Sequence, residues 1–132
     1  METTANREEL THEPNSNLER VREFCLSFPE AHEVEAWGEP TFRVRNKIFV
    51  MYASENTHHS KKCNEVWIKA QKEDQEILLQ SASEHYFSPP YVGCKGWIGA
   101  YLDENTDWEE LQEIIKDGYS QIAPKRLLAQ MT

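Results

Sequence analysis

The stretch that decides the fold is residues 41–52, TFRVRNKIFVMY, in which two segments of strand character flank a short polar pair. Residues 41–45 alternate apolar and basic side chains, which is the period of a strand with one buried face. Asn46-Lys47 suits a tight turn, and residues 48–52 form a continuous apolar run. The pattern therefore predicts a β-hairpin whose second strand is the more buried one.

Further strands are expected on both sides of this hairpin. Residues 33–37 have the character of a short edge strand, which Gly38 and Pro40 bring to an end. Residues 66–70 follow a polar loop and predict a third sequential antiparallel strand, and residues 97–102 alternate as a strand should. The sheet is therefore expected to contain four to five strands.

Two helical segments precede the last strand. Residues 17–27 carry apolar side chains at helical spacing and follow a capping-box pattern at Ser16 and Glu19. Residues 72–81 are also helical in pattern, and their first turn is acidic, as the helix dipole favours. An N-terminal helix and a middle helix are therefore expected.

A C-terminal helical segment follows a second capping-box pattern at Thr106 and Glu109. Its apolar side chains recur on one face as Trp108, Leu111, Ile115 and Tyr119, before Pro124 starts a final turn. These elements predict the α+β class, with an antiparallel sheet of four to five strands backed by an N-terminal helix, a middle helix and a C-terminal helical segment.

The composition fits one domain. Residues 1–15 have little apolar periodicity and contain Pro14, so we expect a flexible leader, with residues 16–132 forming a single domain. No run approaches the roughly 18 apolar residues of a membrane helix, and the first residues do not resemble a signal peptide. Three widely spaced cysteines favour reduced thiols. We therefore expect a cytoplasmic monomer without membrane attachment.

Charge is distributed unevenly along the chain. The net charge is −9 and the pI about 5.0, which disfavours long-range attraction of phosphate. Residues 41–72 nevertheless contain seven basic and two acidic side chains, whereas the segments on either side are acidic. A local basic face is therefore compatible with an acidic protein.

Three groups of motifs follow one another along most of the chain from the first helix onward. They are Pro29-Glu30-Ala31 with Trp37-Gly38-Glu39-Pro40, Thr41-Phe42-Arg43-Val44 and Lys47-Ile48-Phe49; Pro90-Tyr91-Val92-Gly93-Cys94-Lys95-Gly96-Trp97; and Tyr119-Ser120-Gln121-Ile122-Ala123-Pro124-Lys125. In order and spacing these motifs resemble the MmcQ/YjbR family. The resemblance implies a small α+β fold with a curved antiparallel sheet, a frataxin-like shape, and an arrangement described as a double-wing DNA-binding fold.

A nucleic-acid-binding surface is the first functional hypothesis, and DNA is the partner that the resemblance implies. If Phe42 and Val44 face the core, Arg43 and Arg45 share the other face of their strand, and guanidinium groups bind phosphate in a bidentate manner. The alternative is a solvated sheet face whose charges protect an edge. The expected residues are Arg43, Arg45, Lys47, Lys69 and Lys95, with Lys125 and Arg126 if they lie nearby.

The glycine-rich loop supports a second hypothesis, a small-anion-binding or protein-interaction module. Successive backbone N–H groups could form an anion nest, while the aromatic side chains offer stacking surfaces. The alternative is a connection whose aromatic residues belong to the core. The expected ligand-loop residues are Tyr91, Gly93, Lys95, Gly96 and Trp97.

Catalytic and metal-binding patterns are weaker. Cys94 beside Lys95 could be a reactive thiol with His85 as its base, but no orienting residue is identifiable. The neighbouring His58 and His59 with Cys63 match no zinc pattern. We therefore expect a non-enzymatic protein without a catalytic residue, metal or cofactor.

A carboxylate-rich ridge that binds cations is a minor alternative, since carboxylates are ligands for hard cations. Such residues more often only confer solubility. The ridge would consist of Glu19, Glu23, Glu30, Glu33, Glu35 and Glu39.

Overall fold

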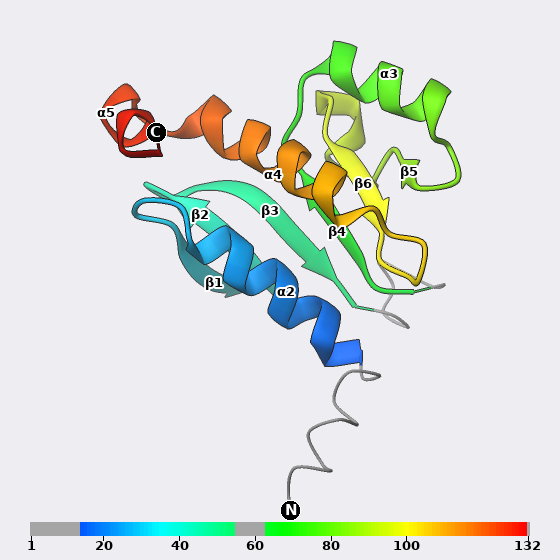
Figure 1. The fold of residues 1–132 in the computed structure, drawn as a ribbon, viewed down its shortest axis with the longest axis horizontal. Helices are drawn as coiled ribbons and strands as arrows, with labels where there is room; N and C mark the ends of the chain where they lie inside the picture. Colours follow the sequence, from blue (N-terminus) through cyan, green and yellow to red (C-terminus); the bar gives the residue numbers. More distant parts are fainter. Residues whose placement is uncertain (1–13, 55–62, 132) are drawn as a thin grey trace, which may run out of the picture.

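An antiparallel sheet organises the chain (Figure 1). The computed structural model describes residues 14–54 and 63–131, and over these ranges the sheet has six strands in the order β1-β2-β3-β4-β6-β5. Four to five strands were expected, and the additional one is the two-residue β5. The strands are β1 His32–Ala36, β2 Glu39–Val44, β3 Lys47–Ala53, β4 Glu65–Ile68, β5 Tyr86–Phe87 and β6 Ile98–Tyr101.

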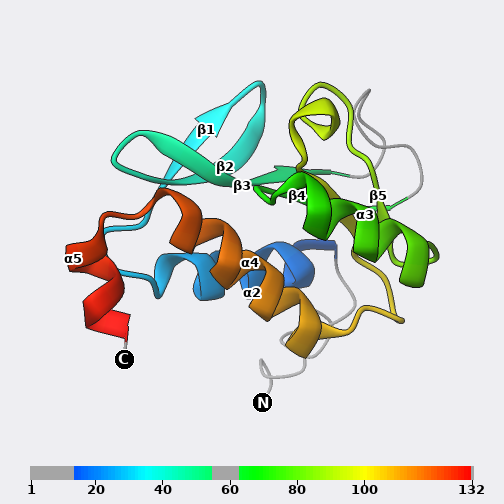
Figure 2. The same ribbon diagram turned by 90° about the horizontal axis from the view of Figure 1, so that it is seen from above.

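The main helices lie on one side of this sheet. Helices α2 and α4 cross the same face, and α3 lies at the far edge beside β5 (Figures 1 and 2). The predicted α+β class is therefore confirmed. No helix within the described ranges combines the length and apolar composition needed to cross a bilayer. The bounds are α2 Pro14–Leu26, α3 Lys72–Ser81, α4 Trp108–Ile122 and α5 Lys125–Leu128, with the 3₁₀ turns η2 Gly93–Lys95 and η3 Ala129–Met131.

The β2–β3 turn lies one residue earlier than the sequence predicts. Arg45 and Asn46 both have left-handed backbone angles, with φ of 53° and 68°, which suit a two-residue hairpin turn. Lys47 is consequently the first residue of β3 and not part of the turn. Arg45 therefore lies outside the strand on which it was expected.

Both predicted capping boxes are misplaced. Ser16 lies inside α2, which begins at Pro14 and not after Ser16 as the capping pattern predicts. Residues 1–13 of the expected leader lie outside the described part of the chain. At α4 the N-cap is Asp107, whose carboxylate accepts a hydrogen bond from the Glu110 N–H at 3.1 Å. Thr106 instead donates its hydroxyl to the Tyr101 carbonyl.

A β-bulge concentrates apolar side chains on the helix-covered face. Phe42 pairs with Val50, but Arg43 pairs with Ile48, so Phe49 has no partner on β2. Both Phe49 and Val50 are fully buried in the main core. The bulge therefore adds one aromatic side chain to the face that meets the helices.

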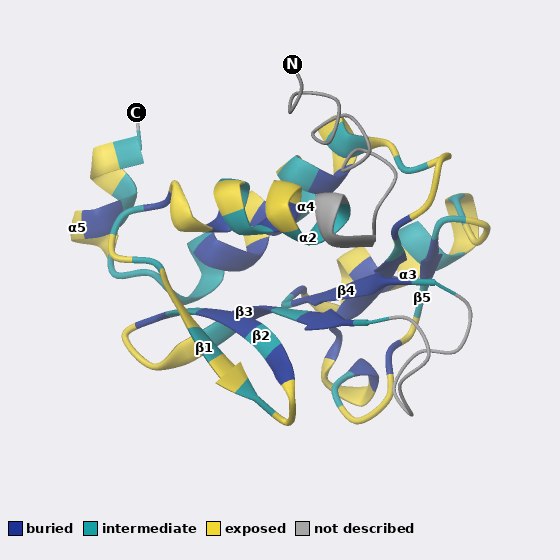
Figure 3. Ribbon diagram, turned by 90° about the horizontal axis from the view of Figure 1, so that it is seen from below, coloured by how far each residue is buried: buried dark blue, intermediate teal, exposed yellow. Residues whose placement is uncertain are grey.

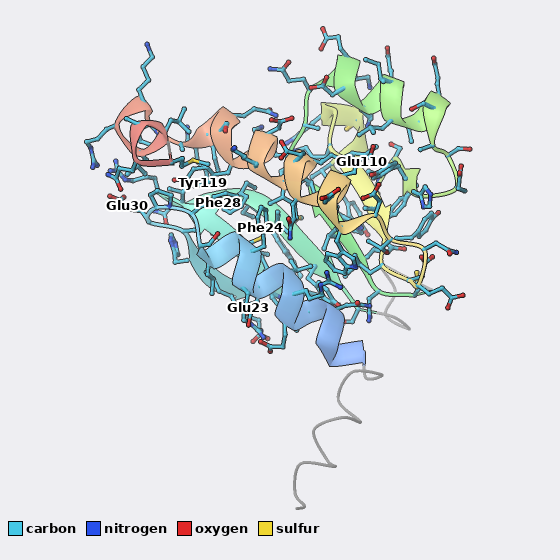
Figure 4. The ribbon with its side chains drawn as sticks, viewed as in Figure 1. Glu23, Phe24, Phe28, Glu30, Glu110 and Tyr119 are labelled. Carbon is cyan, nitrogen blue, oxygen red and sulfur yellow. The ribbon has the colours of Figure 1, made fainter. Side chains whose placement is uncertain are left out.

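Phe49 belongs to an aromatic cluster that joins both long helices to the sheet. The Phe28 and Tyr119 rings stack with centroids 4.6 Å apart, and Phe49 meets Tyr119 edge-on at 5.4 Å. The Tyr119 hydroxyl also donates to the Pro29 carbonyl at 2.7 Å. Figure 4 shows Phe28 and Tyr119 together near the end of α2. The cluster thereby fixes the segment that leads from α2 into β1.

The Tyr119 hydrogen bond can be tested by a conservative change. Tyr119→Phe keeps the stacked ring and removes only the hydroxyl, so we expect a loss of about 1 kcal/mol in the free energy of unfolding. Urea denaturation measures this loss. Ser120→Ala, which removes an exposed hydroxyl bonded to the Lys116 carbonyl, is the control. If both variants lose the same free energy of unfolding, the Tyr119 hydrogen bond stabilises the protein no more than an ordinary hydrogen bond within a helix does.

Candidate functional site

The candidate site lies on the sheet face turned away from α2 and α4. Met51 of β3 pairs with Trp67 of β4, and Trp67 pairs with Gly99 of β6, so these positions share the face opposite the main core. Trp67 packs with Ala53 and Trp97 in a second, smaller hydrophobic cluster. This face is therefore apolar at its centre although no long helix covers it.

Two segments project from this face and enclose a groove. One is the β1–β2 hairpin and the other is the connection from β5 to β6, as Figures 2 and 3 show. The groove has a volume of about 570 Å³. Its floor and walls are mostly apolar, and we call it the aromatic groove after Trp37, Trp67 and Tyr91; Met51, Ala53 and Val92 also line it.

Trp37 and Tyr91 are the most exposed large apolar side chains on this groove. They are 69% and 72% exposed, and their φ angles are 56° and 66°. Trp37 and Gly38 form the two-residue turn of the β1–β2 hairpin, where Asn or Gly is usually favoured at positive φ. Left-handed backbone costs a residue with a Cβ roughly 1–2 kcal/mol. The aromatic side chains at these two positions are therefore not explained by burial in a core, nor by the conformation of the backbone.

The groove also contains fixed polar groups. Glu39 is only 8% exposed, and its two carboxylate oxygens accept hydrogen bonds from the Ser54 N–H at 2.9 Å and the Ser54 hydroxyl at 2.8 Å. The Thr41 hydroxyl donates to the Val34 carbonyl and accepts from Arg43 Nε. Burial, together with the Glu39 charge, raises the pKa of Tyr52, which therefore lines the groove as a neutral phenol.

The wall that carries Tyr91 is held by a buried side chain from α3. Gln75 is 3% exposed, and its Nε2 donates to the carbonyls of Gly93 at 2.8 Å and Trp97 at 2.7 Å. Gly96 adopts φ 100° and lies against the Lys72 backbone, where a Cβ would come within 2.9 Å of the amide nitrogen. The connection from β5 to β6 is therefore anchored at both ends of η2.

The expected anion nest in this loop is wrong. The N–H groups of Gly93, Lys95, Gly96 and Trp97 donate to carbonyls within the loop itself, because the chain forms a 3₁₀ turn there. Trp97 is buried against Trp67 and offers no exposed stacking surface. Of the other residues expected to form a ligand loop, Tyr91 lines the groove and Lys95 is exposed. Gly93 and Gly96 lie so close to Ser88 and to the Lys72 backbone that neither position has room for a side chain.

The expected row of arginines on one sheet face is also wrong, because the turn begins at Arg45. Arg43 remains on the open face, where its Nε bonds to Thr41. Arg45 instead forms an ion pair with Glu30 at 2.9 Å, and Arg126 approaches the same carboxylate at 3.5 Å. Two of the expected cations are therefore partly neutralised by a shared acid.

Three of the expected lysines lie at one end of the sheet. Lys47 begins β3, and the Lys69 N–H just after β4 donates to the Phe49 carbonyl at 3.0 Å. Lys95 precedes β6, next to the turn that leaves β4. Lys125 begins α5, beside Arg126. The antiparallel order thus places Lys47, Lys69 and Lys95 at the same end of the strands.

The six glutamates of the expected acidic ridge do not assemble. Glu19 and Glu33 pair with Arg22, whereas Glu30 pairs with Arg45 and Arg126. Glu39 lies on the opposite face, in the groove, and Glu23 and Glu35 are exposed. In the part of the chain that the structure describes, no three His, Cys, Asp or Glu side chains could hold a metal ion.

The proposed thiol pair is not assembled either. Cys94 is exposed, and its Sγ lies 3.5 Å from the Tyr91 carbonyl. His85 lies against Tyr86 and Glu84, and over the described residues no hydrogen bond joins it to Cys94. Cys25 is buried in the main core, and the reduced state of the cysteines stays a prediction. His58 and His59 lie outside the described residues.

The sequence interpretation missed the groove, although signals for two of its residues were present. Val66 and Ile68 mark the core face of β4, so the period of a strand places Trp67 on the other face. Trp37 precedes Gly38 at a turn, where an aromatic residue is unusual. Their meeting with Tyr91 could not be inferred, because it depends on how the sheet and a distant loop fold together.

Comparison with known proteins agrees with this architecture. The YjbR family model matches residues 26–121. The crystal structure of the Deinococcus radiodurans protein DR2400, which has a DUF419 domain, is similar with a TM-score of 0.69 and 16% sequence identity, over 86% of each chain. At this identity the likeness concerns the fold. No match was found among curated proteins.

The Gln75 anchor can be tested separately from any ligand. Gln75→Leu keeps the volume but leaves two buried carbonyls without their donor, so we expect the protein to lose roughly 1–3 kcal/mol of stability. Faster hydrogen exchange at the amides of residues 93–97 would accompany this loss. Gln80→Leu, on the exposed face of the same helix, is the control. Unchanged exchange in the loop would refute the anchoring role.

Proposed function

The chain belongs to the YjbR family, and from this premise we propose that it is a non-enzymatic binding module whose ligand occupies the aromatic groove. The observation that supports this proposal is the pair of exposed aromatic side chains, Trp37 and Tyr91, over an apolar floor. A volume of about 570 Å³ suits a small molecule or a short segment of a partner. Residues held in a costly backbone conformation tend to occur at functional sites.

A binding role fits the groove better than a catalytic one. Its polar side chains are held in place by hydrogen bonds, Glu39 to Ser54 and Thr41 to Arg43. Among the described residues that line the groove, none is a Cys, Ser or Lys nucleophile beside a base. The absence of enzymatic activity, like the monomeric state, stays a prediction.

Replacement of Trp37 should separate stability from binding. Asn tolerates a left-handed backbone better than Trp, so we expect Trp37→Asn to leave the free energy of unfolding unchanged or raise it by up to about 1 kcal/mol. The uncharged dye Nile red, which fluoresces in apolar sites, should bind the unmodified protein saturably. Its affinity should fall at least about tenfold in Trp37→Asn and in Tyr91→Asn, because each change removes an apolar wall of the groove.

The matched control is Ile77→Asn, which removes an apolar side chain that is 62% exposed on α3, away from the groove. This variant should bind Nile red as the unmodified protein does. Equal loss in all three variants would indicate non-specific adsorption of the dye. Retention of binding in both groove variants would refute the proposed site.

DNA binding is the second candidate function, supported by the position of Lys47, Lys69 and Lys95 at one end of the strands. No ion pair within 4 Å involves these three lysines among the residues that the structure describes. The net charge of −9 and the pairing of Arg45 with Glu30 oppose this function. For this reason we place it second.

The two functions respond differently to salt and to mutation. If DNA binds, its affinity for a double-stranded oligonucleotide should fall steeply with salt, and Lys47→Ala should reduce the slope of log K against log salt by about 1. Lys116→Ala on α4 serves as the control. Fluorescence anisotropy at two salt concentrations measures both effects. Absence of binding at low salt would exclude this candidate.

A further inference from the structure

We propose that the aromatic groove selects a small organic cation, an ammonium-bearing molecule with an apolar body. This inference rests on the proposed function and names the chemical class of its ligand. The groove combines a buried carboxylate with aromatic side chains, and these are the two features that recognise an ammonium group.

Glu39 provides the negative charge. Its carboxylate lines the groove at 8% exposure, and each oxygen accepts one hydrogen bond, both from Ser54. A carboxylate oxygen has two lone pairs, so each retains capacity for a further donor. No Lys, Arg or His nitrogen of the described residues lies within 4 Å of this carboxylate. Among the described residues Glu39 is thus buried without a counter-charge, which is costly, and a cationic ligand would offset that cost.

The aromatic residues provide the second feature. The faces of Trp and Tyr rings carry negative charge density that attracts cations, and Trp is the most effective. Trp37, Trp67 and Tyr91 all line the groove, and Met51 adds a polarizable side chain beside Trp67. An apolar body attached to the ammonium group would cover this surface. The net charge of −9 further favours the approach of cations.

Anions are disfavoured by the same structure. The N–H groups of Gly93, Lys95, Gly96 and Trp97, which could have bound an anion, donate instead to carbonyls of the same loop. One cation on this face, Arg43, is bonded to Thr41 and does not line the groove. It lies four residues beyond Glu39 along β2, about 13 Å at the rise of a strand. Arg43 therefore leaves the Glu39 charge available to a ligand.

A free small molecule is the occupant that fits these dimensions. The groove is lined by Trp37 of the β1–β2 hairpin and by Tyr91 of the β5–β6 connection, and its volume is about 570 Å³. Figures 2 and 3 show these two segments projecting from the same face of the sheet. This volume lies within the range of small-molecule sites in proteins.

Two probes of the same shape test the inference, each measured by displacement of Nile red from the intact protein. One is 3-hydroxyphenyltrimethylammonium, and the other is its uncharged isostere, 3-tert-butylphenol. We expect the cation to bind about tenfold more tightly, because only the cation gains from the carboxylate and the ring faces. Glu39→Gln should reduce this preference to roughly twofold or less. Glu35→Gln removes the same charge outside the groove and should keep the preference.

The outcomes distinguish the inference from the function on which it rests. If the uncharged isostere binds as tightly as the cation, or if neither probe displaces bound Nile red, the inference fails while groove binding stands. If Nile red does not bind at all, the proposed function fails. A preference that a folded Glu39→Gln variant retains would also overturn the inference. Should that variant not fold, the comparison of the two probes on the unmodified protein still decides.

Discussion

The contact between Tyr119 and the Phe28-Pro29 segment is the constraint on which the rest of the structure depends. Ring stacking with Phe28 at 4.6 Å and a hydrogen bond to the Pro29 carbonyl at 2.7 Å join Tyr119 to a segment about 90 positions earlier in the sequence. This contact holds α2 and α4 on one face of the sheet and fixes the point from which β1 begins. Because both long helices occupy that face, only short segments remain to cover the other.

The incomplete cover of the second face creates the groove. The segment between β5 and β6 shields Trp67 with Trp97 and Val92, and Gln75 of α3 fixes its position. The β1–β2 hairpin rises opposite and leaves Trp37 exposed. A single antiparallel sheet thus has one face packed against the long helices and another that is only partly covered.

The electrostatic character of the molecule follows from the same arrangement. Arg45, from the basic middle of the chain, lies in the β2–β3 turn, where Glu30 partly neutralises both Arg45 and Arg126 of α5. The groove instead contains the buried carboxylate of Glu39. Among the described residues Arg43 and Arg45 therefore do not share one sheet face, and the groove is the site on which the proposed function rests.

The sequence by itself determined the α+β class, the central hairpin, helix α3 at Lys72–Ser81 and the family, because hydrophobic periodicity, turn residues and motif order are local properties. It misplaced the turn at Arg45 and the cap at Asp107 by one residue, since neighbouring polar residues compete for such positions. Only the tertiary structure decided that Trp37, Trp67 and Tyr91 line one groove. Strand pairing and loop packing bring these residues together from separate elements, and no periodicity within a single segment encodes that contact.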